Sequence, residues 1–258
     1  MKSKFARTQS RFRTATLPAA GMLLCFWTAI VSAQTNNYNF SFAANIAVPD
    51  GDTSGLAIRH DLTGLNGSIA SVTVSLDISG GFNGDLYAYL AGPTGGFAVL
   101  LNRVGVANGN AFGYADTGFS LTFDDSFSYE NIHHYQDSSY SLNGDGQLTG
   151  TWATDGRTID PLSDPAVFDL TTPAASLDSF DGTDPNGTWT LFVADLSGGG
   201  QSTIINWGLT IETVPEPSAG ALVAIGAGIL LAARRRINGF LRVKSSIFQR
   251  HVVHAPPR

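Results

Sequence analysis

The 258 residues carry a formal net charge of −6, and this charge is divided sharply along the chain. Residues 34–217 hold all 21 acidic residues and only three basic ones, Arg59, Arg103 and Arg157, for a net charge of −18. Such an acidic region repels phosphate backbones, which argues against nucleic acid as a partner, and it suits divalent cations. The single cysteine, Cys25, lies close to the N-terminus, so the region that follows forms no disulfide.

The N-terminus has the three parts of a secretory signal peptide. Basic residues between Lys2 and Arg13 precede an apolar run over residues 17–30, and Val31-Ser32-Ala33 matches a small-x-small cleavage site. We therefore predict that residues 1–33 form a signal helix that is removed after Ala33. An uncleaved anchor is the alternative.

Eight short stretches between residues 34 and 213 alternate apolar and polar side chains, as half-buried strands do. The clearest is 69–78, in which Ala70, Val72, Val74, Leu76 and Ile78 share one face, and next comes a hairpin, 86–90 and 97–101, with a turn at Pro93-Thr94-Gly95-Gly96. The others are 38–48, 119–123, 148–153, 188–194 and 203–211, and residues 130–169 read as a long polar excursion. These stretches predict an all-β fold, an antiparallel, jelly-roll-like β-sandwich in one domain over residues 34–213.

The C-terminal region combines a rigid motif, an apolar run and a basic stop. Val214-Pro215-Glu216-Pro217-Ser218 cannot continue a strand or helix, residues 219–233 carry no charge, and Arg234-Arg235-Arg236 follows at once. A helix of that apolar run spans roughly 22 Å, less than the ~30 Å of a bilayer core. We predict a hydrophobic helix within a sorting signal over residues 214–236, followed by a disordered basic tail over residues 237–258.

This C-terminal block resembles the PEP-CTERM sorting signal. The resemblance implies export, contact with the export machinery, recognition by an exosortase-type processing enzyme, and a transient or anchored stay at the inner membrane before the cell surface or the extracellular space. It also implies a link to extracellular polysaccharide. The chain differs from the family pattern in continuing beyond Arg236 to Arg258.

The middle of the chain resembles the P/homoB domain, the β-sandwich that accompanies subtilisin- and kexin-like serine endopeptidases. The matching motifs are Gly84-Asp85-Leu86, Pro93-Thr94-Gly95, Gly187-Thr188-Trp189 and Asn206-Trp207-Gly208-Leu209, within residues 69–211. The resemblance implies a module that supports a catalytic neighbour.

No set of catalytic residues emerges from the sequence. The exported region has only His60, His133 and His134 as bases and no Gly-x-Ser-x-Gly motif, so we predict no enzymatic activity. His133 and His134 with Asp137 could ligate zinc, but adjacent residues of a strand face opposite sides, and a solvated polar loop is the favoured interpretation.

Calcium is the favoured cofactor, because it takes carboxylate and amide oxygens from loops. The candidate ligands are Asp85, Asp124, Asp125, Asp181, Asp184, Asn186 and Asp195. The alternative is that these residues make turns and caps.

Trp152, Trp189 and Trp207 could stack on sugars, but Trp189 and Trp207 lie on apolar faces and are predicted to be buried, which leaves Trp152 as the freer one. Tyr87 and Tyr89 could bind a ligand or pack against the second sheet. We predict an exported, non-catalytic surface or matrix protein that binds or organises polysaccharide or protein partners. The alternative is an accessory module of a subtilisin- or kexin-like protease system.

Overall fold

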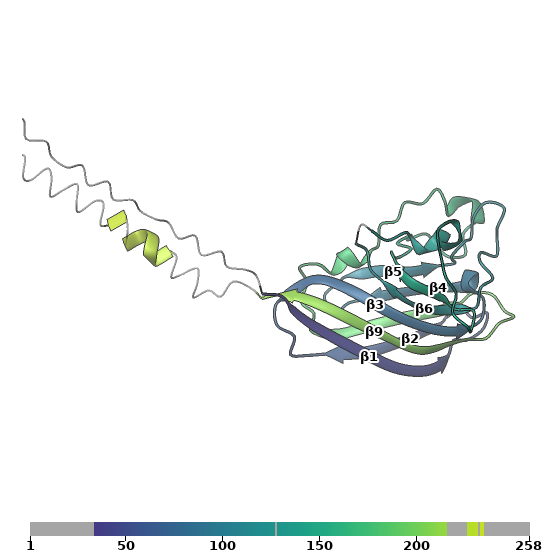
Figure 1. Cartoon of the computed structure of the whole chain (residues 1–258), viewed down its shortest axis with the longest axis horizontal. Helices are drawn as coiled ribbons and strands as arrows, with labels where there is room; N and C mark the ends of the chain where they lie inside the picture. The colour runs from purple at the N-terminus through teal and green to yellow at the C-terminus, as the bar shows by residue number, and fades with distance from the viewer. Residues whose placement is uncertain (1–33, 127, 216–225, 232, 235–258) are drawn as a thin grey trace, which may run out of the picture. The chain divides into compact units, whose positions relative to one another are not determined.

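The computed structural model describes residues 34–126, 128–215, 226–231 and 233–234. Nine strands in two sheets occupy the first two of these ranges (Figure 1). The strands are β1 (Asn36–Ala47), β2 (Leu56–Leu62), β3 (Ser68–Gly80), β4 (Leu86–Ala91), β5 (Phe97–Asn102), β6 (Gly118–Phe123), β7 (Leu148–Trp152), β8 (Gly187–Asp195) and β9 (Ser202–Val214). Four short 3-10 helices lie in the connections: η1 (Asn83–Asp85), η2 (Ile132–Asp137), η3 (Pro165–Val167) and η4 (Leu177–Phe180).

The two sheets confirm the predicted all-β sandwich. One has the strand order β1-β9-β3-β6-β7 and the other β2-β8-β4-β5. In Figure 1, β1, β9 and β3 run side by side across the nearer sheet. Every pair is antiparallel except β6 with β7, which is parallel. A parallel neighbour needs a crossover instead of a hairpin, and residues 124–147 supply it.

The core lies between the sheets and is built by strand alternation. Leu86, Ala88 and Leu90 of β4 are fully buried, and so are Trp189 of the neighbouring strand β8 and, at 1% exposure, Trp207 of β9 in the other sheet. The prediction for these two tryptophans is therefore confirmed. Tyr87 and Tyr89 alternate with the buried residues of β4 and are only half-buried. They lie on the outer face of their sheet, where the ring of Tyr89 stacks on that of Phe192 with centroids 4.8 Å apart, so they do not pack against the second sheet.

Two local details differ from the sequence prediction. In β3, Ile69 is buried in place of Ala70, because a bulge between Ile69 and Ser71 shifts the register against β9 and turns the first residues over. The strand β2 is absent from the prediction altogether. At this sheet edge Leu56 and Ile58 are only half-buried, and the polar His60 occupies one of the inward positions of the alternation, so the apolar pattern is weak.

The predicted sorting segments lie largely outside the described residues. Ala33, Glu216, Pro217, Arg235 and Arg236 are among the residues that are not described. Val214 ends β9 and Pro215 follows it, while residues 226–231 and 233–234, the last of which is Arg234, are helical, as predicted for this stretch. Within the described ranges, no helix has the length and apolar character needed to cross a membrane.

Candidate functional site

The connection from β6 to β8, residues 124–186, forms both of the polar features that could carry function, and we call it the excursion. Its strand β7 adds to the edge of the five-stranded sheet. At one end of β7, the amide of Thr149 donates to the carbonyl of Ser141, and at the other end the amide of Ile132 donates to the carbonyl of Ala153. The free edge of β7 is thus covered at both ends and open at Gly150 and Thr151 between them.

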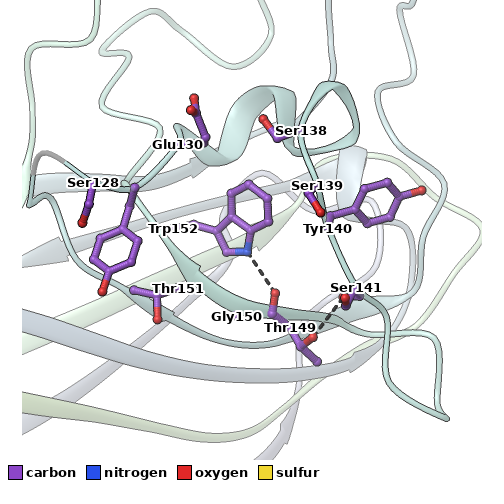
Figure 2. Close-up of a pocket in the computed structure, with 11 residues that line it drawn as sticks. Ser128, Glu130, Ser138, Ser139, Tyr140, Ser141, Thr149, Gly150, Thr151 and Trp152 are labelled. Atoms are coloured by element: carbon purple, nitrogen blue, oxygen red, sulfur yellow. Dashed lines mark hydrogen bonds between the residues drawn. The ribbon is translucent and has the colours of Figure 1, made fainter.

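A groove lies over this open edge, with a volume of about 620 Å³. Hydroxyl groups and aromatic rings dominate its lining, with a single carboxylate from Glu130. Figure 2 shows Trp152 at the centre of the site, with Ser138, Ser139 and Tyr140 around one side of it. The full lining is Ser128, Tyr129, Glu130, Ser138, Ser139, Tyr140, Ser141, Thr149, Gly150, Thr151 and Trp152. The volume is within the range of small-ligand sites in proteins.

The aromatic residues of the groove differ in exposure. Trp152 is only 5% exposed, because its indole packs on Tyr135 and its Nε1 donates to the carbonyl of Thr149 at 3.0 Å. Trp152 is therefore only slightly more exposed than Trp189 and Trp207, although part of the residue lines the groove. Tyr129 and Tyr140 are 39% and 40% exposed. The ring of Tyr140 packs edge-on against the ring of Tyr135, with centroids 5.4 Å apart. This contact restricts the Tyr140 side chain while leaving part of its ring exposed to the groove.

Sequence reasoning missed Tyr129 and Tyr140. The available signal was compositional, since residues 126–141 are rich in serine and tyrosine. Rigid tyrosines supply contact area and small hydroxyl residues supply adaptable hydrogen bonds, which is the composition that binding loops use.

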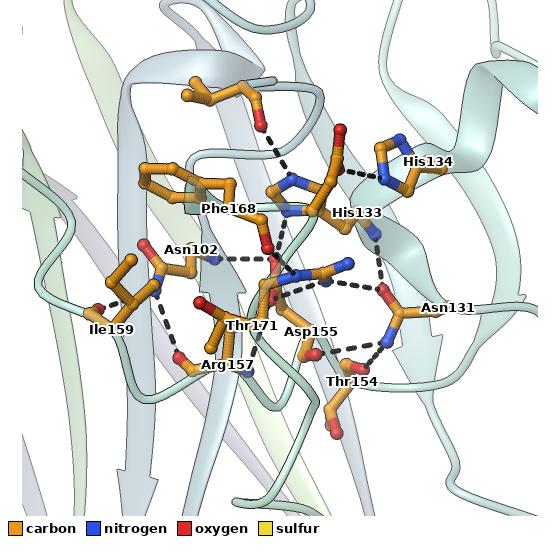
Figure 3. Close-up of polar contacts among 12 residues, drawn as sticks. Asn102, Asn131, His133, His134, Thr154, Asp155, Arg157, Ile159, Phe168 and Thr171 are labelled. Carbon is orange, nitrogen blue, oxygen red and sulfur yellow. Dashed lines mark hydrogen bonds and ion pairs between the residues drawn. The ribbon is translucent and has the colours of Figure 1, made fainter. Parts of the chain in front are cut away.

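A second polar feature, a buried cluster around His133 and Asp155, lies where the excursion meets β5 (Figure 3). Both residues are fully buried, and His133 Nδ1 lies 2.6 Å from Asp155 Oδ2. Arg157 Nη1 contacts the other oxygen of Asp155 at 3.2 Å, and Arg157 Nε donates to the carbonyl of Phe168. The prediction of a solvated loop at His133 is therefore wrong, since a polar sequence is buried here by pairing its charges.

The geometry of His133 does not fit nucleophilic catalysis. In a catalytic triad, the ring nitrogen remote from the carboxylate faces a serine or cysteine nucleophile. Here that nitrogen, Nε2, lies 3.0 Å from the carbonyl oxygen of Val106. Both neighbours of the ring are acceptors, so the pair ties the excursion to the end of β5 and has no group to activate.

The contacts of the two His133 ring nitrogens also argue against the predicted zinc site. His133, His134 and Asp169 place one ligand atom each within 4.8 Å of the others, and His134 Nε2 lies 2.9 Å from Asp169 Oδ1. Asp137, the carboxylate expected from the sequence, is 3.7 Å from His134 Nδ1. Both ring nitrogens of His133 are already engaged and the ring is inaccessible, so these residues do not fit a metal centre.

The structure places the seven candidate calcium ligands at three separate positions. Asp85 and Asp195 lie at neighbouring ends of η1 and β8 and are buried. Asp124, Asp125 and Asp181 line a shallow cavity of about 260 Å³ together with Asp178. Asp184 and Asn186 lie in the turn before β8.

Most of these candidates already have structural roles. The carboxylate of Asp125 accepts from the amide and hydroxyl of Thr154 and from the amide of Leu177. The exposed Asp184 accepts from the backbone and side chain of Asn186, which holds the pKa of its carboxyl below the usual value. These are turn and cap contacts, the alternative interpretation of the aspartates. Burial raises the pKa of three of the candidates, Asp85, Asp195 and Asp181.

The comparisons with known proteins assign no family. No family model matches the chain, and no curated protein matches it. Solved structures that match part of the chain include the serine protease of Aeromonas sobria, at 13% identity and a TM-score of 0.39, and the same protease in complex with its chaperone, at 14% identity and a TM-score of 0.38. Each match covers 70% of this chain and 27% of the other, so the chain spans about a quarter of their length.

Proposed function

We propose that the protein is an exported, non-catalytic surface or matrix protein that binds a neutral polysaccharide in the groove over β7. The observation that carries the proposal is the lining of that groove, in which two half-exposed tyrosines accompany six serine and threonine residues. Sugars present both apolar ring faces and hydroxyl groups. Aromatic side chains can cover the first and hydroxyl side chains can bond the second.

The charge of the region favours a neutral ligand over an acidic one. Glu130 is the single charged residue of the groove lining, and residues 34–217 carry a net charge of −18. An acidic polysaccharide would be repelled at low ionic strength. Export through the signal peptide and sorting through the PEP-CTERM-like tail belong to the same proposal and supply the compartment in which such a polymer is found.

A binding experiment on the full chain, purified in mild detergent, tests this proposal. Retention on a set of immobilised neutral polysaccharides is compared with retention on acidic ones. We expect Tyr140→Ala and Tyr129→Ala each to weaken binding by about tenfold, because an aromatic contact contributes on the order of 1 kcal/mol. The matched control is Phe112→Ala, which removes a 78% exposed aromatic residue outside the groove and should bind as the parent does.

Two outcomes would contradict the proposal. Binding to no neutral polysaccharide would remove its basis. Equal loss in the Phe112→Ala control would show non-specific adhesion. Fractionation with mass spectrometry of the native C-terminus tests the sorting step, which fails if the cellular protein still ends at Arg258 in the cytoplasm.

A further inference from the structure

A small cavity opens beside η1, where that helix meets the turn between β8 and β9. Its volume is about 300 Å³, at the small end of the range for ligand pockets. The lining comes from three segments that are distant in sequence, residues 82–85, 112–115 and 197–198, and none of these residues lines the groove over β7. The cavity is therefore a second concave site, with a size that suits a small organic group.

Aromatic rings supply much of the surface of this cavity. Three of its eight lining residues are aromatic, and the two less exposed of them, Phe82 and Tyr114, are held by packing. The Phe82 ring rests against Gly200 of the β8–β9 turn, where an added Cβ would lie 3.3 Å from it, and the Tyr114 ring packs edge-on against Tyr135 with centroids 4.7 Å apart. Aromatic faces attract cations, because the π-system places negative charge above and below the ring.

Asp85 is the only carboxylate among the described residues that line the cavity, and it is 7% exposed. In the part of the chain that the structure describes, no group donates a hydrogen bond to this carboxylate and no basic side chain forms an ion pair with it. A buried carboxylate without a partner is costly, whether it stays charged or takes up a proton. A monovalent cation in the cavity would compensate its charge.

The charges around the cavity also favour a cation. Asp195 and Asp50 lie outside the lining, but the charge of each raises the pKa of the Asp85 carboxyl, as burial does. Arg103 acts in the opposite direction and less strongly than burial or Asp195, and its Nε and Nη2 donate to backbone carbonyl oxygens instead of to Asp85. The field at the cavity is therefore negative, so it attracts cations and repels anions.

We propose that this cavity binds a small quaternary ammonium compound without an acidic group, with Asp85 opposite the positive charge and the rings of Phe82 and Tyr114 against the methyl groups. A single carboxylate does not fit calcium, which takes six to eight oxygen ligands. A primary ammonium carries three hydrogen-bond donors, for which phenylalanine offers no acceptor. A quaternary ammonium group needs no hydrogen bond and is the cation that aromatic sites recognise best. This inference does not depend on what the groove over β7 binds.

Calorimetric titration of the full chain with choline, in a non-ionic detergent, tests the proposal. We expect choline to bind about tenfold more tightly than 3,3-dimethyl-1-butanol, which has the same shape but no charge, because only choline gains from Asp85 and the aromatic rings. Phosphocholine should also bind more weakly than choline, since the negative field of the site repels its phosphate. This third ligand distinguishes a free trimethylammonium compound from a phosphate-linked one.

Two variants locate the binding. Asp85→Asn removes the charge and keeps the shape, and it should weaken choline binding by about tenfold. Phe82→Leu removes the ring and keeps an apolar side chain, and it should weaken binding by about fivefold. Phe82 is 42% exposed, so this second variant should fold even if Asp85→Asn does not. Phe97→Leu is the matched control, because Phe97 is 37% exposed and does not line the cavity, and it should bind choline as the parent does.

The proposal is overturned by any of four results. These are no binding of choline to the parent, equal affinity for the uncharged analogue, tighter binding of phosphocholine than of choline, and unchanged affinity in Phe82→Leu. Equal affinity for the uncharged analogue would mean that the cavity recognises apolar shape and not charge.

Discussion

Trp189 and Asp155 are both fully buried, but they lie in regions held together by different forces. Trp189 lies between the two sheets, packs on Phe180 with ring centroids 5.1 Å apart, and needs one hydrogen bond, from its Nε1 to the carbonyl of Pro185. Asp155 lies at the base of the excursion and is surrounded by donors from His133, Arg157 and Asn102. Burial of apolar surface away from water stabilises the first region. In the second region, ion pairs and hydrogen bonds among buried charged and polar groups hold the side chains in place.

Substitutions in the apolar core and in the polar cluster should therefore have different effects on the molecule. Apolar packing is shared among many neighbours across both sheets, so a defect in the core weakens the whole sandwich. A polar network fails locally, because each member that loses its partner keeps its desolvation penalty. The groove over β7 is built on the second kind of region, so the binding proposed for it depends on the integrity of the polar cluster.

The largest effect is expected from Trp189→Ala. The substitution removes the largest fully buried side chain of β8 and leaves a cavity between the sheets, and such changes cost about 3–5 kcal/mol. Urea denaturation of the full chain should show a lower midpoint by tryptophan fluorescence and by circular dichroism alike. Leu170→Ala is the control, since Leu170 is 81% exposed and its loss should leave the midpoint unchanged. A shift seen by one probe alone would contradict the view of the sandwich as one cooperative unit.

The next effect, about 3 kcal/mol in local stability, is expected from Asp155→Ala. The substitution removes the carboxylate that His133 and Arg157 contact while both residues stay buried. Removing one partner of a buried ion pair is strongly destabilising, because the other partner stays buried without compensation. Hydrogen exchange should accelerate over residues 131–137 and 153–159, while β3 and β9 keep their protection. Asp137→Ala, which removes a 78% exposed carboxylate from η2, should change neither region. Uniform acceleration across the sheets would show that the excursion has no independent stability.

This contrast also explains how much of the molecule could be predicted from its sequence. The alternation of β4, and of most of β3 and β9, predicts their buried faces, since one face of each must enter the core, whereas the register shifts between β3 and β9 follow from no pattern in the sequence. No such period exists for the excursion, where His133, Asp155 and Arg157 are brought together by a tertiary arrangement and not by spacing. The calcium candidates show the same limit, because the sequence reveals seven residues with side-chain oxygens but not that Asp85 and Asp195 are buried while the others serve turns and caps.

The smallest effect is expected at the boundary of the two regions, from Tyr135→Phe. Tyr135 is fully buried in η2, its hydroxyl donates to Asp116 Oδ2 at 2.8 Å, and it accepts from Nδ2 of Asn83, the first residue of η1. Loss of this link between excursion and sandwich should cost about 1–2 kcal/mol at neutral pH.

The pH dependence of the same variant separates the hydroxyl from the ring. Burial raises the pKa of Tyr135 well above its usual value, so the folded state holds this proton more tightly than the unfolded state does. That contribution to stability is fully present below pH ~10, the ordinary tyrosine pKa, and is lost as the pH rises above it. Tyr135→Phe should therefore lose less stability than the parent between neutral and strongly alkaline pH, measured by urea denaturation. The control is Tyr140→Phe, which removes the hydroxyl of a residue that is 40% exposed, and its unfolding free energy should change with pH as that of the parent does. If the unfolding free energies of Tyr135→Phe and the parent change with pH in parallel, the Tyr135 hydroxyl does not couple the two regions.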